Sequence, residues 1–512
     1  MFKRLLGALI VVSIASLARH AQAAVEERSI DALQADLASG RTTSEALVRA
    51  YLDRIRRFDR AGPTLRSVLA LNPDALADAR ALDRERKVHG PRGPLHGIPI
   101  VIKDNIESRE ALATTAGSLA LAANVTRRDA PLVAQLRAAG AIVLGKTNLS
   151  EWANFRSERS TSGWSAVGGL VRNPYVLDRS ACGSSSGTGA AVAASLAAAG
   201  IGSETDGSIT CPSALNSLVG LKPTIGLVAQ QGIVPISHSQ DTAGPMARDV
   251  RDVALLMNAI ADPAKRGATD YTSALSPDAL RGKRLGVLRY EDGQMPTVDD
   301  AYAHALERLQ AAGATLVEVK SPWDDRIGKA EDLVLHTEFK ADLNAYLATA
   351  PAGVQSRSLA DLIEFNKDTP AELRWFGQDV FVKSQDTKGL EDPEYIAALE
   401  LGRRLAGAEG LGRVMSENRL DALVAPTTGP AWTIDTLNGD HYGGSFTTMP
   451  AVAGYPHLTV PMGFVRALPV ALSFIGAPDS DAALLGYGFA FESVAKARRA
   501  PKYLKTIDRI DR

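Results

Sequence analysis

The spacing of hydrophobic residues changes within the first hundred positions. From Ser29 to Leu82, apolar residues often recur at intervals of three and four, which is typical of amphipathic helices. From Pro94 to Asn105, the chain instead carries a short apolar run flanked by glycine and proline. Such a run predicts a buried strand, here ending at Lys103. We therefore expect a helical N-terminal region around the core and a strand inside it.

Two helix-to-strand units follow, and they resemble each other. Leu132 to Ala139 precedes Gly140 and a strand-like run, and Tyr302 to Ala312 precedes Gly313 and a second such run. Each glycine stands where the end of a helix needs a left-handed residue. The other expected elements are a helix over Gly189 to Ala199 and strands at 141–144, 285–288, 315–317 and 458–460. This alternation predicts an α/β fold with a large mixed β-sheet covered on both faces by helices.

Length and charge limit what the chain can do. At 512 residues and 45% hydrophobic, it can bury a large core, and we expect 24–512 to form a single domain. Residues 320–415 are richer in charge and helix formers, so we expect a helical excursion over that core. The net charge of -1, with acidic and basic residues interspersed, argues against nucleic acid or an anionic membrane as partner. A small molecule or a peptide fits better, and nothing indicates the oligomeric state.

The N-terminus has the features of a signal peptide. Lys3 and Arg4 precede an apolar stretch from Leu5 to Leu17, and Ala21-Gln22-Ala23 provides small residues before Ala24. An uncleaved anchor is the alternative, but the stretch is short for a membrane span. We expect residues 1–23 to be removed and the protein to be exported, either periplasmic or secreted, with no membrane attachment afterwards.

The chain has two cysteines, Cys182 and Cys211. They could pair in an oxidising compartment, or they could be two small buried side chains. Two cysteines without a histidine cluster do not make a zinc site. We therefore expect no metal and no cofactor, and the pairing stays open.

Residues Gly140 to Thr147 match the phosphate-binding pattern G-x-x-x-x-G-K-[ST]. A true phosphate loop follows a strand and opens a helix. Here a predicted helix precedes the pattern, and the four residues between the two glycines form a strand-like apolar run. The context therefore argues against nucleotide binding.

Two loops rich in hydroxyl groups stand out: Gly183 to Gly187, which contains Ser184, and Glu204 to Ser208. A Gly/Ser run can be a flexible linker, but the first loop leads directly into an alanine-rich segment suited to burial. Together with Lys103, the loops indicate a serine nucleophile with a lysine in its proton relay and no histidine.

At these positions the sequence resembles the amidase signature family. The resemblance spans roughly residues 30 to 500 in ordered motifs, which include 97–105, 145–151, 172–175, 182–187, 203–212, 220–224, 241–246, 453–456 and 460–463. It implies an amidase that forms an acyl-serine intermediate. Carried over residue by residue, it makes Ser208 the nucleophile, Ser184 the bridging hydroxyl and Lys103 the base. It also implies a cis peptide bond between Gly183 and Ser184.

The resemblance further implies an oxyanion hole from the backbone N–H groups of Thr205, Asp206 and Gly207. Ser185 is expected to hold the site residues in position without contacting the substrate. Lys103 can accept a proton only when neutral, and burial lowers the pKa of a lysine by disfavouring its charged form. The proton it takes can then return to the departing nitrogen.

The sequence departs from many family members at two positions. Asp206 stands where they have glycine, and Thr210 stands where they have arginine. Without that arginine, a substrate carboxylate lacks a bidentate partner. The run Glu204 to Pro212 most resembles the peptide amidases, so we expect a C-terminal peptide amide as substrate, with Asp206 either contacting it or only bracing the turn. The alternatives are a generic aliphatic or aryl acylamidase, a lipid-amide hydrolase, a binding protein without catalysis and one component of an amidotransferase.

Overall fold

The computed structural model describes residues 25–289 and 296–507. The predicted signal peptide, residues 1–23, lies outside this part. Within it, no helix is both long enough and apolar enough to cross a membrane.

An eleven-stranded mixed sheet forms the centre of the molecule, which confirms the predicted α/β class. In spatial order its strands are β1 (Val68–Leu71), β3 (Ile142–Thr147), β2 (Pro99–Lys103), β6 (Ala199–Glu204), β8 (Thr242–Ala247), β7 (Val219–Lys222), β12 (His457–Val465), β13 (Leu468–Ile475), β11 (Ala422–Pro426), β9 (Arg284–Val287) and β10 (Thr315–Glu318). Strand β2 runs parallel to β3 and β6, and β9 runs parallel to β10 and β11, whereas the other neighbours are antiparallel. A separate hairpin pairs β4 (Trp164–Ser165) with β5 (Gly169–Leu170).

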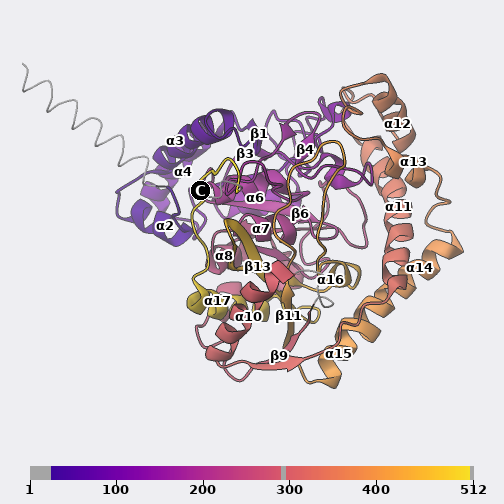
Figure 1. The fold of residues 1–512 in the computed structure, drawn as a ribbon. Coiled ribbons are helices and arrows are strands. Elements are labelled where there is room, and N and C mark those ends of the chain that lie inside the picture. Colours follow the sequence, from indigo (N-terminus) through magenta and orange to yellow (C-terminus); the bar gives the residue numbers. More distant parts are fainter. Residues whose placement is uncertain (1–24, 290–295, 508–512) are drawn as a thin grey trace, which may run out of the picture.

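Helices cover both faces of the sheet. They are α2 (Ile30–Ala38), α3 (Ser44–Arg54), α4 (Ala75–His89), α5 (Pro131–Ala138), α6 (Ser186–Ala193), α7 (Thr210–Leu215), α8 (Val250–Ile260), α9 (Pro263–Arg266), α10 (Pro296–Ala311), α16 (Thr448–Val452) and α17 (Asp481–Ala495). Residues 325–417 add α11 (Asp325–Ala348), α12 (Leu359–Asp368), α13 (Asp379–Gln385), α14 (Pro393–Arg403) and α15 (Gly412–Glu417). Figure 1 shows α11 to α14 along one side of the molecule, opposite α2 to α4.

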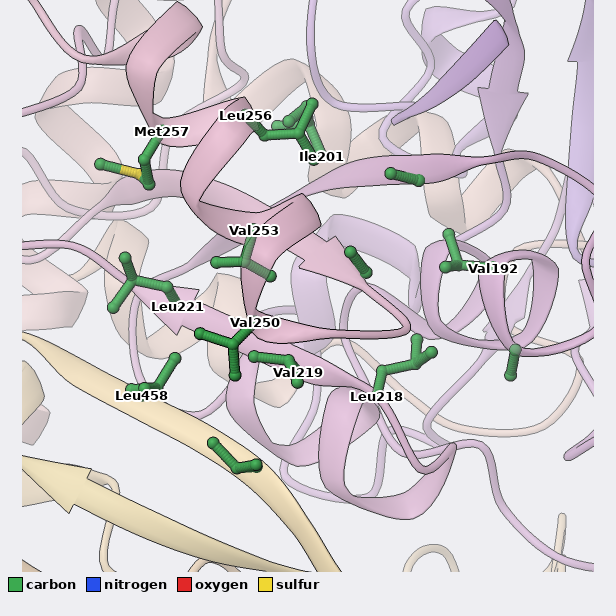
Figure 2. Packing of buried hydrophobic residues seen from close by; sticks show 14 of the residues in the cluster. Val192, Ile201, Leu218, Val219, Leu221, Val250, Val253, Leu256, Met257 and Leu458 are labelled. Carbon is green, nitrogen blue, oxygen red and sulfur yellow. The ribbon is translucent and has the colours of Figure 1, made fainter. Parts of the chain in front are cut away.

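Successive residues of a strand point to opposite faces of the sheet, and the two faces are covered by different helices. On β6, Ile201 packs towards α8, whereas a Cβ placed at Gly200 would lie 2.6 Å from the Thr188 side chain of α6. The small glycine thus lets α6 lie directly on the strand. On the other face, apolar residues at helical spacing in α8, among them Val253 and Leu256, pack on β6, β7 and β12 (Figure 2). Burying each such side chain contributes about 1.5–3 kcal/mol.

The predicted helix-to-strand units are present. Helix α5 ends before Gly140 and α10 ends before Gly313, whose φ angles are 89° and 93°, so both glycines take the expected left-handed conformation. The phosphate-loop pattern is no loop, because Gly145, Lys146 and Thr147 lie within β3.

Two predictions of local structure were wrong. The helix expected over 189–199 is α6, which covers Ser186–Ala193, and Ala199 already begins β6. Ser195, at φ 54°, leaves the helical conformation between them. The segment expected to be helical up to Leu82 also contains β1, which pairs with β3 at the edge of the sheet. In both places the apolar run is compatible with a helix or a strand, and packing against neighbouring elements determines which of the two forms.

Candidate active site

Three of the predicted site residues stand where strands end or helices begin. Lys103 is the last residue of β2, Ser184 lies two residues before α6, and Ser208 lies between β6 and α7. Because β2 and β6 are parallel neighbours, their carboxyl ends meet at one edge of the sheet. The topology therefore brings residues more than 100 positions apart into one site.

Lys103 is fully buried and held by hydroxyl and carbonyl oxygens. Its Nζ lies 2.7 Å from Ser184 Oγ, 2.9 Å from Ser203 Oγ and 3.1 Å from the Ser203 carbonyl oxygen. Among the described residues, no carboxylate oxygen lies within ion-pair distance of it. Burial lowers the pKa of Lys103 to about 7, although the charges of Asp241 and Glu204 act in the opposite direction. About half of these side chains are thus neutral near pH 7.

The loops that carry Ser184 and Ser208 are linked to each other. The Ser185 N–H donates to the Ser208 carbonyl oxygen at 3.2 Å, and the Ser185 hydroxyl donates to the Ser203 carbonyl oxygen at 3.1 Å. The peptide bond between Gly183 and Ser184 is cis, as expected. Among the described residues, the Ser208 hydroxyl has no hydrogen-bond partner, and Ser208 lines the adjacent cavity. Ser185 therefore connects the Ser208 loop to the strand beneath it.

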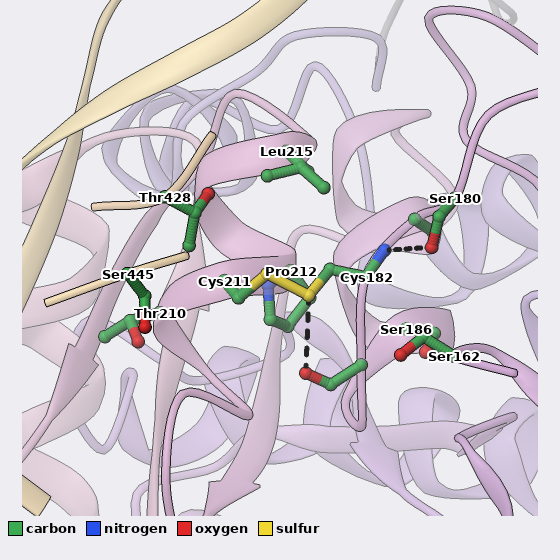
Figure 3. The surroundings of a disulfide bond; sticks show 12 residues. Ser162, Ser180, Cys182, Ser186, Thr210, Cys211, Pro212, Leu215, Thr428 and Ser445 are labelled. Atoms are coloured by element: carbon green, nitrogen blue, oxygen red, sulfur yellow. Dashed lines mark hydrogen bonds between the residues drawn. A yellow bond between two sulfur atoms is a disulfide. The ribbon is translucent and has the colours of Figure 1, made fainter. Parts of the chain in front are cut away.

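A disulfide bond connects the same two loops, which answers the question that the sequence left open. Cys182 and Cys211 are bonded, with their Cα atoms 6.0 Å apart (Figure 3). Cys182 precedes Ser184 by two residues, and Cys211 follows Ser208 by three. The bond therefore fixes the separation of the two loops close to both serines.

The loop from Thr205 to Gly207 is braced from two sides. The Thr205 hydroxyl donates to Asp241 Oδ1 at 2.5 Å, and the Thr448 hydroxyl donates to Asp206 Oδ2 at 2.6 Å. Gly207 has φ 75°, a conformation that favours glycine. These contacts hold the backbone N–H groups of the loop in place before the start of α7.

Asp206 has an unusual environment for a carboxylate. Its Oδ1 atom is buried and has no hydrogen-bond partner among the described residues, and the residue lines the cavity. Burial raises the pKa of Asp206, which hydrogen bonds from Thr447 and Thr448 partly oppose. One carboxylate oxygen of this cavity-lining residue thus lacks a partner, and it is closed off from solvent in this side-chain position.

The sequence did not single out four residues that support the site: Ser203, which accepts from Lys103, and Glu204, Asn105 and Asp241. Glu204 Oε2 accepts from the N–H groups of Ile209 at 2.7 Å and Thr210 at 2.9 Å, so this buried carboxylate caps α7 directly after Ser208. Asn105 donates to Ser203 Oγ at 2.9 Å, which orients that hydroxyl for Lys103. Asp241 holds Thr205 as described above. The acidic residue four positions before Ser208 was the one signal in the sequence that could have indicated such a cap.

The cavity beside Ser208 has a volume of about 470 Å³, within the range of small-molecule sites. Its lining contains three carboxylates and no lysine, arginine or histidine. The residues that give it its charge and its aromatic walls are Glu158, Asp206, Asp440, Phe155, Trp432 and Tyr442. A neutral or cationic substrate therefore suits this cavity better than an anionic one.

Two clusters of described residues offer ligand atoms for a metal ion: Glu158, Asp332 and His336, and His238, Glu338 and Asp342. Asp332 already pairs with Lys383 at 2.7 Å, and Glu338 already accepts from Tyr395 at 2.8 Å. Neither cluster includes Lys103, Ser184 or Ser208.

Comparisons with known proteins agree with this geometry. A family profile described as "Amidase" matches residues 46–485. A protein of Arabidopsis thaliana described as a probable amidase is 37% identical over 503 residues, covering 94% of this chain and 92% of that protein. A glutamyl-tRNA(Gln) amidotransferase component of Symbiobacterium thermophilum is 34% identical over 480 residues, covering 90% of this chain and 96% of that protein.

A solved structure, the native peptide amidase from Stenotrophomonas maltophilia, is 50% identical, with a TM-score of 0.87 and coverage of 94% of this chain and 99% of that one. The profile match and these likenesses extend over nearly all of the described fold. The chain therefore belongs to the amidase signature family and is a hydrolase that acts on amide bonds.

Proposed function

We propose that this enzyme hydrolyses C-terminal peptide amides to the peptide acid and ammonia, with Ser208 as nucleophile, Ser184 as bridging hydroxyl and Lys103 as base. The observation that carries the proposal is the 2.7 Å contact between a fully buried Lys103 and Ser184, in the loop that Ser185 joins to Ser208. The 50% identity to a peptide amidase supports the choice of substrate.

The first half of the reaction forms the acyl-enzyme. Ser208 Oγ attacks the amide carbonyl carbon while its proton passes to Ser184, whose own proton passes to neutral Lys103. The oxyanion takes hydrogen bonds from the backbone N–H groups of Thr205, Asp206 and Gly207, and losing one such donor costs about 100- to 1000-fold in rate. The proton then returns through Ser184 to the leaving nitrogen, the C–N bond breaks and ammonia departs.

The second half releases the acid. A water molecule attacks the ester carbon and gives one proton to the same relay, and Ser208 leaves as the hydroxyl by taking that proton back. The product is a carboxylate beside Asp206 and two further acidic side chains. Repulsion between these charges favours its release.

Asp206 is our candidate for recognition of the substrate amide. Its Oδ1 atom has no partner, and a turn of the side chain would let it accept a hydrogen bond from an N–H group of a peptide amide, which an ester or a peptide acid does not present in the same place. A site built to pair with such a donor discriminates strongly against a substrate that lacks it.

We further propose that the enzyme is exported. The signal-peptide features of the N-terminus support this, and so does the disulfide between Cys182 and Cys211, since such bonds persist in oxidising compartments. Mass spectrometry of the protein recovered from the periplasm or medium tests it, with an N-terminus at Ala24 expected.

An ammonia-release assay across matched substrates tests the substrate class. We expect an acetylated dipeptide amide to give a kcat/KM at least about 100-fold above that of propionamide, because remote contacts in the cavity stabilise the transition state. The Asp206→Ala variant should lower kcat/KM for both amides, because both present the N–H group that we assign to Asp206, while Thr436→Ala, outside the amide cavity, should leave both values unchanged. Equal kcat/KM for both substrates would instead identify a generic aliphatic amidase.

A further inference from the structure

A second cavity, of about 330 Å³, lies apart from the residues that line the amide site. The hairpin of β4 and β5 contributes one wall through Trp164, Gly169 and Leu170, and Arg374 and Trp375 contribute another. Its volume is within the range of sites that bind small organic molecules.

Three arginines line this cavity: Arg66, Arg172 and Arg374. Among the described residues, none of their guanidinium groups has a carboxylate partner, and no acidic residue is in the lining. The net charge of the whole chain is only -1, so this local excess of positive charge is not a general property of the surface. Three like charges around one hollow repel one another, and a bound anion would offset that repulsion.

One of these cations, Arg374, lies against a flat apolar wall of the cavity. The Arg374 guanidinium lies 4.8 Å from the centre of the Trp375 ring, and Trp164 packs edge-on against Phe376 at 5.2 Å. Arg66 has φ 55°, an uncommon conformation for a residue other than glycine. A Cβ placed on Gly169 would lie 2.8 Å from Arg66 Nη1, so the glycine leaves the space that this guanidinium occupies.

We propose that this cavity binds a small organic anion with a flat apolar body and at least two carboxylate, sulfonate or phosphate groups. Planar guanidinium groups pair with such oxygens in bidentate fashion, and tryptophan faces accept a flat ring. The amide cavity has the opposite character, because it is lined by three carboxylates and no basic residue. The molecule thus has two cavities of opposite charge, and the anion would bind in the second, arginine-lined cavity.

Isothermal titration calorimetry with naphthalene-1,5-disulfonate as probe tests the proposal on the full-length enzyme. We expect saturable one-to-one binding that weakens as salt is added. Each of Arg66→Gln, Arg172→Gln and Arg374→Gln should weaken binding about tenfold, the scale of one charge-assisted hydrogen bond. All three side chains are exposed, so circular dichroism spectra of the variants should match that of the wild type.

Arg84→Gln is the matched control, because Arg84 is also exposed and lies outside the cavity. Its affinity for the probe should equal that of the wild type. Unchanged affinity in the triple arginine variant, no binding at millimolar probe, or competitive inhibition of amide hydrolysis by the probe would each overturn the proposal. Binding of neutral 1,5-dimethylnaphthalene with equal affinity would do the same, since the charges would then contribute nothing.

Discussion

The charge of Asp241 should set the pH at which the enzyme becomes active. Lys103 must be neutral to accept the proton from Ser184, and its pKa is about 7. In the wild type, kcat/KM should therefore rise with pH and reach a plateau above about pH 8, with about a tenth of the plateau rate at pH 6. The carboxylate of Asp241, whose own pKa burial raises to about 6, stabilises the charged lysine above that pH.

The variant Asp241→Asn removes this charge; its amide oxygen can still accept from the N–H groups of Ile236 and Ser237, as Oδ2 does, and its NH2 group can donate to the Thr205 hydroxyl. The pKa of Lys103 should fall, so the rising limb of the profile moves to lower pH. The rate at pH 6, divided by the plateau rate, should increase, by at most about tenfold because the wild type already retains a tenth. Initial rates of ammonia release between pH 5 and 9, under subsaturating substrate, provide the measurement.

The variant Thr205→Val separates the two roles of Asp241. It removes the 2.5 Å hydrogen bond but keeps the carboxylate, so the plateau should fall; because this bond also lowers the pKa of Asp241, the limb should move only part of the way that it moves in Asp241→Asn. A limb that does not move in Asp241→Asn would refute the electrostatic link between Asp241 and Lys103. A wild-type profile that is flat between pH 5 and 9 would refute the role of a titrating lysine altogether.

Three further predictions follow from contacts in the site. Ser208→Ala and Lys103→Ala should each reduce kcat by about 10⁴-fold or more with the fold intact, because members of a proton relay act as a unit; circular dichroism is the control, and normal turnover in either variant would sink the mechanism. Lys103→Met should raise the free energy of unfolding at pH 6 by a few kcal/mol, since the buried lysine has a lowered pKa and the wild type regains that stability only as pH rises from about 7 towards 10.5. Denaturant unfolding at pH 6 and pH 10 measures it, and an equal gain at both would contradict the cause. The double variant Cys182→Ser, Cys211→Ser should lose about 3.6 kcal/mol of unfolding free energy, the scale for closing a loop across a separation of 29 residues, and a reducing agent should reproduce the loss in the wild type only.

The sequence predicted most of the elements that position the site. The strand ending at Lys103 was recognisable because a short apolar run, flanked by glycine and proline, stops at a charged residue, and the two serine loops stood out by composition. The sheet that joins β2 to β6 makes neighbours of residues 100 positions apart, and local patterns do not encode such contacts. For that reason Ser203, which holds Lys103, and Asp241, which holds Thr205, were not singled out.

The disulfide shows the same limit. Whether Cys182 and Cys211 bond depends on the distance between their Cα atoms, which is 6.0 Å in the fold and is not fixed by a sequence separation of 29. Helix α6 was misplaced because an alanine-rich run carries no signal for where a helix stops and a buried strand begins. Features set by chain-local chemistry were thus predictable, whereas those set by packing between distant segments were not.

The most direct test of the account is to find the acyl group during turnover. The enzyme is mixed with an acetylated dipeptide amide, quenched in acid within milliseconds to seconds, digested and mapped by mass spectrometry. The account predicts an acetyl-dipeptidyl ester on Ser208, absent from Ser208→Ala. An acyl group on Ser184, or full ammonia release without any acyl-enzyme at any quench time, would contradict it.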